Sequence, residues 1–198
     1  MEDQNPLLGL IGQLSKLPGV GPKSAQRLSF FFLSLSQKEV ANFASVLTDT
    51  RTRIRYCTSC FNISFQERCY ICQNPKRHTQ TLCVVAEPRD IFAIERTQEY
   101  KGRYHVLGGL ISPIDGIHPE ALRIAELLDR LKQEGVEEVI IALNSTIEGD
   151  ATMHYLTHLL KDIPMKKSKL AYGLPVGADM DYTDELTLRK ALLGRTDV

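Results

Sequence analysis

The sequence predicts an α/β protein with four parts in chain order: a helical region, a small four-cysteine knuckle, a parallel-sheet domain and a short C-terminal helix. Three observations support this fold class. Before the first cysteine, apolar residues recur at helical spacing. The chain then contains two Cys-x-x-Cys pairs, Cys57 with Cys60 and Cys69 with Cys72. From Thr81 onward, short apolar runs alternate with amphipathic helical patterns, which is typical of a parallel sheet with helical crossovers.

The composition is that of an ordinary globular protein. The chain has 198 residues, of which 43% are hydrophobic and 24% are charged, so it can form one or two domains. No apolar run approaches the ~18 residues that a membrane span needs, and the first residues do not resemble a secretory signal peptide. We therefore expect a cytoplasmic protein that has no membrane contact.

The net charge is zero, but the charges are unevenly distributed. Residues 51–80 carry a basic excess, whereas residues 81–198 carry an acidic excess. A basic segment suits contact with phosphates, although an ordinary solvated face explains the charge counts equally well. The segment's single acid is Glu67, and its basic residues are Arg51, Arg53, Arg55, Arg68, Lys76 and Arg77.

Three helices are predicted before the first cysteine. The first spans residues 6–17, with Asn5 as its N-cap and a proline at its first position. The second begins at Pro22, and a third follows the capping-box pair Ser36 and Glu39. In the second and third helices, the residues expected to face a core are Ala25, Leu28, Phe32, Leu35, Val40, Phe43, Leu47 and Ile54.

The turn at residues 17–23, Leu-Pro-Gly-Val-Gly-Pro-Lys, resembles the hairpin of helix-hairpin-helix DNA-binding motifs. Gly19 and Gly21 let the backbone approach a phosphate, and the free N–H groups at the start of the next helix point at the anion. Lys23 and Arg27 stand four residues apart on one helix face and can reach flanking phosphates, so DNA binding would not depend on sequence. The alternative is an ordinary helix connection in which Gly and Pro only break the helices.

The four cysteines have the spacing of a closed tetrahedral zinc site. Zinc in structural sites prefers four thiolates, at Zn–S distances of about 2.3 Å, and such a site has no open position for water. We therefore expect one structural Zn²⁺ held by Cys57, Cys60, Cys69 and Cys72, without catalysis. Two disulfides are the alternative, which a reducing compartment disfavours. The fifth cysteine, Cys83, lies in an apolar run and is expected to be a buried spectator.

After the knuckle, the patterns predict a parallel sheet with helices between its strands. The expected strands are residues 82–86, 103–107, 139–143 and 169–172. The expected helices are residues 90–96, 119–134, a segment after the loop 144–150, and 185–193.

Acidic residues follow two of these strands. Glu87 comes after the first strand, and Glu148 and Asp150 lie in the loop after the third. Because function collects beyond the carboxyl ends of parallel strands, these acids are candidates for a Mg²⁺ site or for contact with a basic partner. The spacing alone favours the alternative, three solvated acids at loop ends.

These acids resemble those of a Toprim domain, the nucleotidyl-transfer and hydrolysis fold of topoisomerases and primases. The order of helix-hairpin-helix, four-cysteine knuckle, Toprim-like sheet and C-terminal helix is similar to that of the RecR family of bacterial recombination mediators. The resemblance covers essentially the whole chain. Its most specific segments are residues 17–21, the cysteine spacing, Gly-Gly-Leu-Ile-Ser-Pro at 108–113, Thr-Ile-Glu-Gly-Asp-Ala-Thr at 146–152 and Leu-Pro-Val-Gly at 174–177.

The resemblance implies a helix-hairpin-helix DNA-binding region at residues 1–56, a four-cysteine zinc finger at 57–72, a Toprim domain at 80–175 and a C-terminal helical segment at 176–198. It also implies a DNA-binding adaptor of recombinational repair, which acts with RecO and RecF to help load RecA at single-stranded gaps. Family members form tetrameric rings. Lys23 and Arg27 would then face DNA inside the ring, while the acids and the knuckle would contact partners, RecO above all.

The resemblance further implies that the chain is not an enzyme. Catalytic Toprim domains usually carry Asp-x-Asp, whereas this chain has Glu148 and Asp150, and the longer Glu displaces a metal ligand by about one methylene. No Gly-x-x-x-x-Gly-Lys-[Ser/Thr] loop is present, so ATP hydrolysis by this chain alone is not expected. Two alternatives stay open: a Mg²⁺-dependent phosphodiesterase or nuclease that uses Glu87, Glu148 and Asp150, and a zinc-stabilised interaction module without a DNA role.

Overall fold

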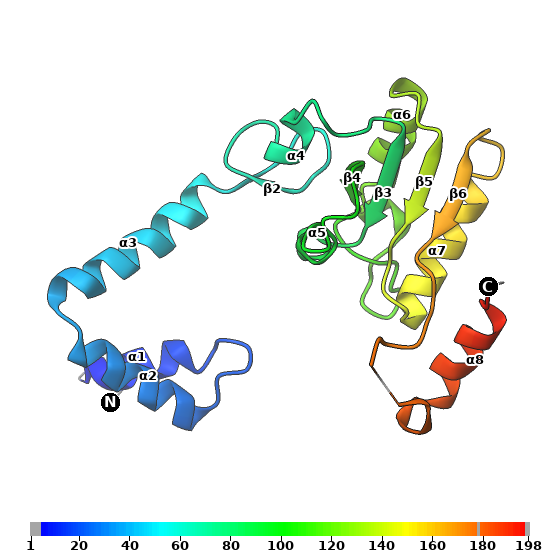
Figure 1. Ribbon diagram of the computed structural model, residues 1–198. Helices are drawn as coiled ribbons and strands as arrows, with labels where there is room; N and C mark the ends of the chain where they lie inside the picture. Colours follow the sequence, from blue (N-terminus) through cyan, green and yellow to red (C-terminus); the bar gives the residue numbers. More distant parts are fainter. Residues whose placement is uncertain (1–4, 178, 197–198) are drawn as a thin grey trace. The chain divides into compact units, whose positions relative to one another are not determined.

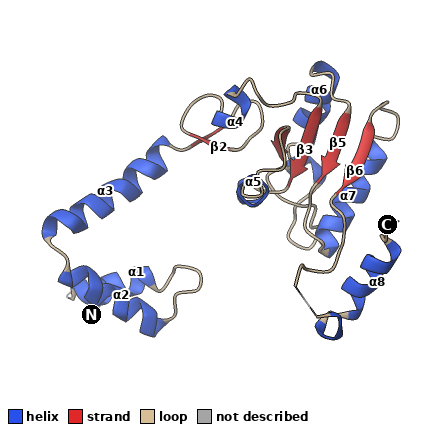
Figure 2. Ribbon diagram, viewed as in Figure 1, coloured by secondary structure: helices blue, strands red, loops and turns tan. Residues whose placement is uncertain are grey.

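The computed structural model describes residues 5–177 and 179–196. The chain divides into two compact units, Met1–Ile54 and Arg55–Val198. The first unit contains helices α1 to α3, and the second contains the knuckle, the sheet and the remaining helices (Figure 1, Figure 2). The α/β fold class is confirmed.

The first unit has the three predicted helices: α1 Pro6–Leu14, α2 Pro22–Ser34 and α3 Gln37–Arg53. Asn5 caps α1, since its side chain accepts a hydrogen bond from the Leu7 N–H at 3.0 Å. Ser36 and Glu39 form the predicted capping box of α3. The prediction that the first helix reaches residue 17 was wrong, because the backbone tightens after Leu14 into hydrogen bonds between residues three apart.

The predicted core of the first unit was largely wrong. Ala25 and Ser29 are buried in α2, but Leu28 is exposed, and α3 has no buried residue. The helices touch, with α1 against α2 and the rings of Phe32 and Phe43 5.1 Å apart, but they are too few to cover each other's apolar faces. The large apolar residues exposed in the described part of this unit are Leu8, Leu17, Leu28, Phe30, Phe31, Leu33, Val40, Phe43, Val46 and Leu47.

The second unit is built on a four-stranded parallel sheet in the order β4-β3-β5-β6. Its strands are β3 Thr81–Val85, β4 Arg103–Val106, β5 Glu138–Ile141 and β6 Lys166–Lys169. The parallel sheet was predicted, but the last strand was placed three residues too late. Ile141, the last residue of β5, pairs with Lys169, so residues 170–172 lie beyond the end of the partner strand.

The two faces of the sheet have different covers. One face, which includes Leu82, Val84 and Val139, packs with residues of α6 and α7 in one apolar cluster. The other face packs with α5 and with the four cysteines of the knuckle in a second cluster, to which Cys83 and Tyr104 belong. The knuckle is thus part of the core of the sheet domain. Its own elements are β1 Arg55–Tyr56, β2 Ile63–Ser64 and α4 Tyr70–Gln73.

The helices of the second unit differ in detail from the prediction. They are α5 Pro88–Glu95, the 3₁₀ turn η2 Pro119–Ala121, α6 Ile124–Gln133, α7 Ile147–Leu159, the 3₁₀ turn η3 Met180–Tyr182 and α8 Glu185–Leu193. Helix α8 agrees with its predicted bounds. Gly135, in a left-handed conformation at φ +60°, follows the end of α6.

The prediction of a single continuous helix at residues 119–134 was wrong. The chain breaks at Leu122 and Arg123, because the Arg123 N–H donates to the Leu107 carbonyl oxygen at 2.8 Å, beyond the end of β4. The helix restarts at Ile124 with a shifted phase. Leu127 is therefore buried, whereas Ala125 is exposed.

The prediction that residues 144–150 form a loop was also wrong in part. Helix α7 begins at Ile147, and the Thr146 side chain caps it by accepting a hydrogen bond from the Gly149 N–H at 3.1 Å. Gly149 is buried, and a Cβ there would lie 1.9 Å from the Asn144 carbonyl oxygen, so only glycine fits. Glu148 and Asp150 therefore project from a fixed helical turn.

Candidate nucleic-acid interface, metal centre and acidic edge

The hairpin turn of the first unit presents an open helix N-terminus. Gly19 has φ +79°, a left-handed conformation that glycine adopts without strain. Gly21 is the N-cap of α2 and has no side chain with which to cap it, so the first N–H groups of the helix lack the usual side-chain acceptor. Among the described residues, no atom outside the adjoining chain lies within 4 Å of a Cβ built at either glycine, which leaves this backbone accessible.

Lys23 and Arg27 extend the positive character of this helix end. Both side chains are exposed, and within residues 5–177 and 179–196 neither forms an ion pair. The first turn of α2 contains no acid. Two free cations beside the positive end of a helix dipole are suited to a phosphate backbone.

The four predicted metal ligands come together. The sulfur atoms of Cys57, Cys60, Cys69 and Cys72 all lie within 4.8 Å of one another, and all four residues are buried. Cys60 and Cys69 have their sulfurs 3.5 Å apart, and the Cys69 N–H donates to the Cys57 sulfur at 3.3 Å. Four converging buried sulfurs fit a tetrahedral, thiolate-preferring metal ion.

The fifth cysteine lies outside this cluster. Cys83 is on β3 and does not belong to the group of four whose sulfur atoms lie within 4.8 Å of one another. Burial raises the pKa of Cys83 to about 12, which keeps this thiol protonated. The spectator role predicted for Cys83 agrees with its burial on the sheet.

Contacts around Phe61 fix the knuckle to the sheet. The Val106 N–H of β4 donates to the Cys60 carbonyl oxygen at 2.9 Å. Phe61 adopts φ +62°, an unusual conformation for a side chain of this size. Its ring lies edge-on to His105, at 5.4 Å between centroids, and the Arg123 guanidinium lies 5.1 Å from its centroid. The metal centre is therefore coupled to the sheet and to the break before α6.

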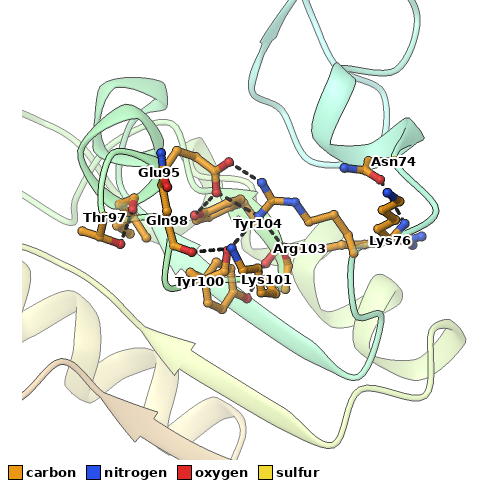
Figure 3. A network of polar contacts seen from close by, with 12 residues as sticks. Asn74, Lys76, Glu95, Thr97, Gln98, Tyr100, Lys101, Arg103 and Tyr104 are labelled. Atoms are coloured by element: carbon orange, nitrogen blue, oxygen red, sulfur yellow. Dashed lines mark hydrogen bonds and ion pairs between the residues drawn. The ribbon is translucent and has the colours of Figure 1, made fainter.

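A second anchor follows the knuckle at Arg77. The Arg77 guanidinium forms a two-nitrogen ion pair with Glu95 on α5, and the Tyr104 hydroxyl donates to the same carboxylate at 2.7 Å. Figure 3 shows Glu95 and Tyr104 directed toward one another. Burial would raise the pKa of Glu95, but these hydrogen bonds outweigh it and hold that pKa below its usual value. Although Arg77 belongs to the basic segment 51–80, its guanidinium therefore has a structural role.

The three predicted acids lie where parallel strands end, and two of them have basic partners. Glu87 is the N-cap residue of α5, and its carboxylate pairs with Arg89 at 2.8 Å. Asp150, in the first turn of α7, pairs with Lys190 of α8 at 3.9 Å and accepts a hydrogen bond from the Tyr172 hydroxyl at 3.3 Å. Among the described residues, the three carboxylates do not form a cluster with all ligand atoms within 4.8 Å of one another.

The sequence patterns did not identify Glu95, Tyr172 or Lys190, and they placed Arg77 in the basic segment 51–80 without revealing its ion pair. Each acts through a partner distant in the chain, and none belongs to a short motif. No helix within the described residues is long and apolar enough to cross a bilayer.

Comparison with known proteins gives matches along nearly the whole chain. A family model described as "RecR, helix-hairpin-helix" matches residues 8–51, one described as "Toprim domain" matches residues 80–171, and one described as "RecR, C-terminal" matches residues 173–196. The chain is 53% identical over 186 residues to the recombination protein RecR of Acidothermus cellulolyticus, covering 94% of both chains. It is 50% identical over 193 residues to that of Gloeobacter violaceus, covering 98% of both.

Proposed function

Because this chain belongs to the RecR family of recombination proteins, we propose that it is a non-catalytic DNA-binding adaptor of recombinational repair. It acts with RecO and RecF to help load RecA at single-stranded gaps, in the cytoplasm, where the chromosome lies. The observation that carries the DNA-binding part is the open N-terminus of α2 with the unpaired cations Lys23 and Arg27.

The chemistry of this turn supports binding to phosphates. Backbone N–H groups beside Gly19 and Gly21 can donate hydrogen bonds to phosphate oxygens, which carry no sequence information. The side chains of Lys23 and Arg27 supply positive charge. Binding therefore depends on counterion release and varies little with DNA sequence.

The test is DNA binding by the double variant Lys23→Ala/Arg27→Ala, measured by fluorescence anisotropy over a range of salt concentrations. Affinity should fall, and the slope of log K against log[salt] should flatten by about 1.4 for single strands or about 1.8 for duplex DNA, for each chain in contact. Lys38→Ala, which removes an exposed charge from α3 of the same unit, is the control and should leave the slope unchanged. Unaltered binding by the double variant would favour an interaction module without a DNA role.

We assign zinc to the four-cysteine cluster, one ion per chain. Soft thiolates in a closed, buried site suit Zn²⁺, which here would supply folding free energy. The site leaves no ligand position for water, so no catalytic step is assigned to it.

We assign the acids Glu87, Glu148 and Asp150 to contacts with a partner. Carboxylates at the edge of a sheet suit a partner surface that carries basic side chains, and RecO is the proposed partner. Glu87 and Asp150 each pair with a basic side chain of the same chain, Arg89 and Lys190 respectively. These pairs argue against a Mg²⁺-dependent phosphodiesterase. DNA cleavage in Mg²⁺ or Mn²⁺ that is abolished by Glu87→Ala would overturn the adaptor proposal.

The apolar surface of the first unit supports self-association. Large exposed apolar patches on soluble proteins mark interaction sites, and those on α2 and α3 have no cover within their own unit. We propose that a second copy covers them and that the assembly is the tetrameric ring, with Lys23 and Arg27 toward the DNA.

A further inference from the structure

A cavity of about 370 Å³ lies where the knuckle meets the carboxyl ends of β3 and β4. The knuckle segment contributes Tyr56 and Phe61 to its lining, and the sheet domain contributes Glu87 and Arg123. The rest of the lining is largely apolar and includes Leu107. Parallel α/β sheets bind their ligands beyond the carboxyl ends of the strands, so the cavity lies where a ligand is expected.

The two aromatic side chains of the cavity stand on a fixed backbone. Tyr56 is 66% exposed, and its strand β1 pairs with β2 and leads directly into Cys57 of the four-cysteine cluster. Phe61 holds its left-handed conformation at φ +62° while its N–H donates to the Cys57 carbonyl oxygen at 2.9 Å. Rings that are in place before a ligand arrives lose little freedom on binding, which makes them good stacking surfaces.

The charged groups at the cavity suit the two parts of a nucleotide. The Arg123 guanidinium is exposed and lies 5.1 Å from the centroid of the Phe61 ring, so it can donate hydrogen bonds to the edge of a base. Arg89 is exposed and pairs with Glu87 at 2.8 Å, which offsets a negative charge that would repel a phosphate. The lining thus offers stacking surfaces and hydrogen-bonding groups without an uncompensated acid, and this combination suits a neutral planar base.

We propose that this cavity takes one unpaired nucleobase of single-stranded DNA, which stacks on Tyr56 and meets Arg123 with its edge, while Arg89 contacts the adjoining phosphate. In a duplex each base is stacked on its neighbours and paired, so only an unpaired base can enter. The hairpin contact at Lys23 and Arg27 binds the phosphates of either form, and the cavity adds a preference for single strands. The inference rests on the proposed DNA-binding role and deepens it with a second contact, in the second unit.

The experiment compares the binding of a labelled oligothymidylate and of a labelled duplex by the full-length, zinc-loaded protein, using fluorescence anisotropy. Tyr56→Ala should raise the Kd for the single strand about tenfold, because it removes the stacking of one base, and should leave the Kd for the duplex unchanged. Tyr56→Phe keeps the ring and should bind as the wild type does. Tyr70→Ala is the matched control, since Tyr70 is 62% exposed on α4 of the same knuckle and is not among the lining residues, and it should change neither Kd.

A second readout reports stacking directly. A fluorescent adenine analogue in the single strand loses fluorescence when it stacks on an aromatic ring, so the wild type should quench it more than Tyr56→Ala does.

Single-strand affinity in Tyr56→Ala equal to that of the wild type would overturn the proposal and would favour a protein partner as the occupant of the cavity. A loss that Tyr70→Ala reproduces, or that extends equally to the duplex, would overturn it too. The variant Lys23→Ala/Arg27→Ala separates this inference from the proposed function, because it should weaken the binding of both DNA forms. If that variant loses binding while Tyr56→Ala does not, the nucleobase site alone is refuted.

Discussion

At the scale of single residues, Cys60 should be decisive for the metal centre. Its sulfur lies 3.5 Å from that of Cys69, inside a buried group of four. Cys60→Ser replaces a thiolate with a hydroxyl, which is a poor zinc ligand, and metal binding in small zinc modules contributes on the order of 10 kcal/mol to folding. We expect the purified variant to contain far less than one zinc ion per chain and to be poorly soluble, as determined by metal analysis and sedimentation.

Cys83→Ala is the matched control for this prediction. Cys83 is also buried in the same apolar cluster, but its sulfur is not one of the four that lie within 4.8 Å of one another. Its variant should retain full zinc content. A zinc content in Cys60→Ser equal to that of Cys83→Ala would refute the assignment of Cys60 as a ligand.

The same scale shows what the sequence can reveal about a site. The four cysteines lie in two short repeated motifs, and their sulfurs converge as that spacing predicted. The proposed DNA-binding residues Gly19, Gly21, Lys23 and Arg27 lie within one turn and the helix after it. Lys190 could not be found in this way. Its partner is forty residues away, and only the folded chain brings α8 to α7.

At the scale of elements, the ion pair of Arg77 and Glu95 joins the segment after the knuckle to α5. Glu95→Gln keeps the shape of the side chain but removes its charge, and hydrogen bonds to charged groups contribute about 2 kcal/mol each. We expect the variant to be less stable by roughly that amount at neutral pH, measured by urea unfolding. Tyr104→Phe, which removes one hydrogen bond to the same charged carboxylate, should also cost about 2 kcal/mol.

The pH dependence of this difference follows from the lowered pKa of Glu95. A carboxyl whose folded pKa is depressed contributes stability above its unfolded value of about 4.3, and this contribution is lost as the pH falls through the folded pKa. The gap between the wild type and Glu95→Gln should therefore be full at neutral pH and should close below about pH 4.3. Both proteins carry the same cysteines, so acid release of the metal cancels in the comparison. A gap that stays constant down to low pH would contradict the ion-pair account.

Element boundaries were predictable where local contacts decide them. Helix α8 has its own cap, since the Asp184 side chain accepts a hydrogen bond from the Thr187 N–H, and its predicted bounds were correct. The helix at 119–134 was predicted without its break, because the break depends on a backbone hydrogen bond to Leu107, which no periodicity in the sequence reveals. The start of α7 was missed for a related reason, namely that Gly149 fits only against the backbone of Asn144.

At the scale of the whole molecule, the first unit cannot bury its own apolar surface. Val40, Phe43 and Leu47 form a stripe at helical spacing along α3, and Leu47 is 59% exposed. Leaving such a stripe in water is unfavourable at about 25 cal/mol for each Å² of apolar surface, so the fold favours its burial against another chain. This is also why the expected core of α2 and α3 failed: the apolar residues do recur at helical spacing, but nothing within the described residues of this unit covers them. In the proposed assembly, other copies supply the cover.

Leu47→Asp should therefore weaken the assembly. A carboxylate in the middle of an apolar interface must be desolvated without a partner, which costs several kcal/mol. We expect the wild type to have a molar mass that is a multiple of 22.3 kDa by light scattering, and the variant to shift toward 22.3 kDa. Asn42→Asp introduces the same charge at an exposed polar position of α3 and should leave the mass unchanged. A wild type that stays at 22.3 kDa at every concentration would show that the stripe is not a self-association surface. The proposal that the protein encircles DNA would then be refuted, because a ring needs several chains to place Lys23 and Arg27 around one polyanion.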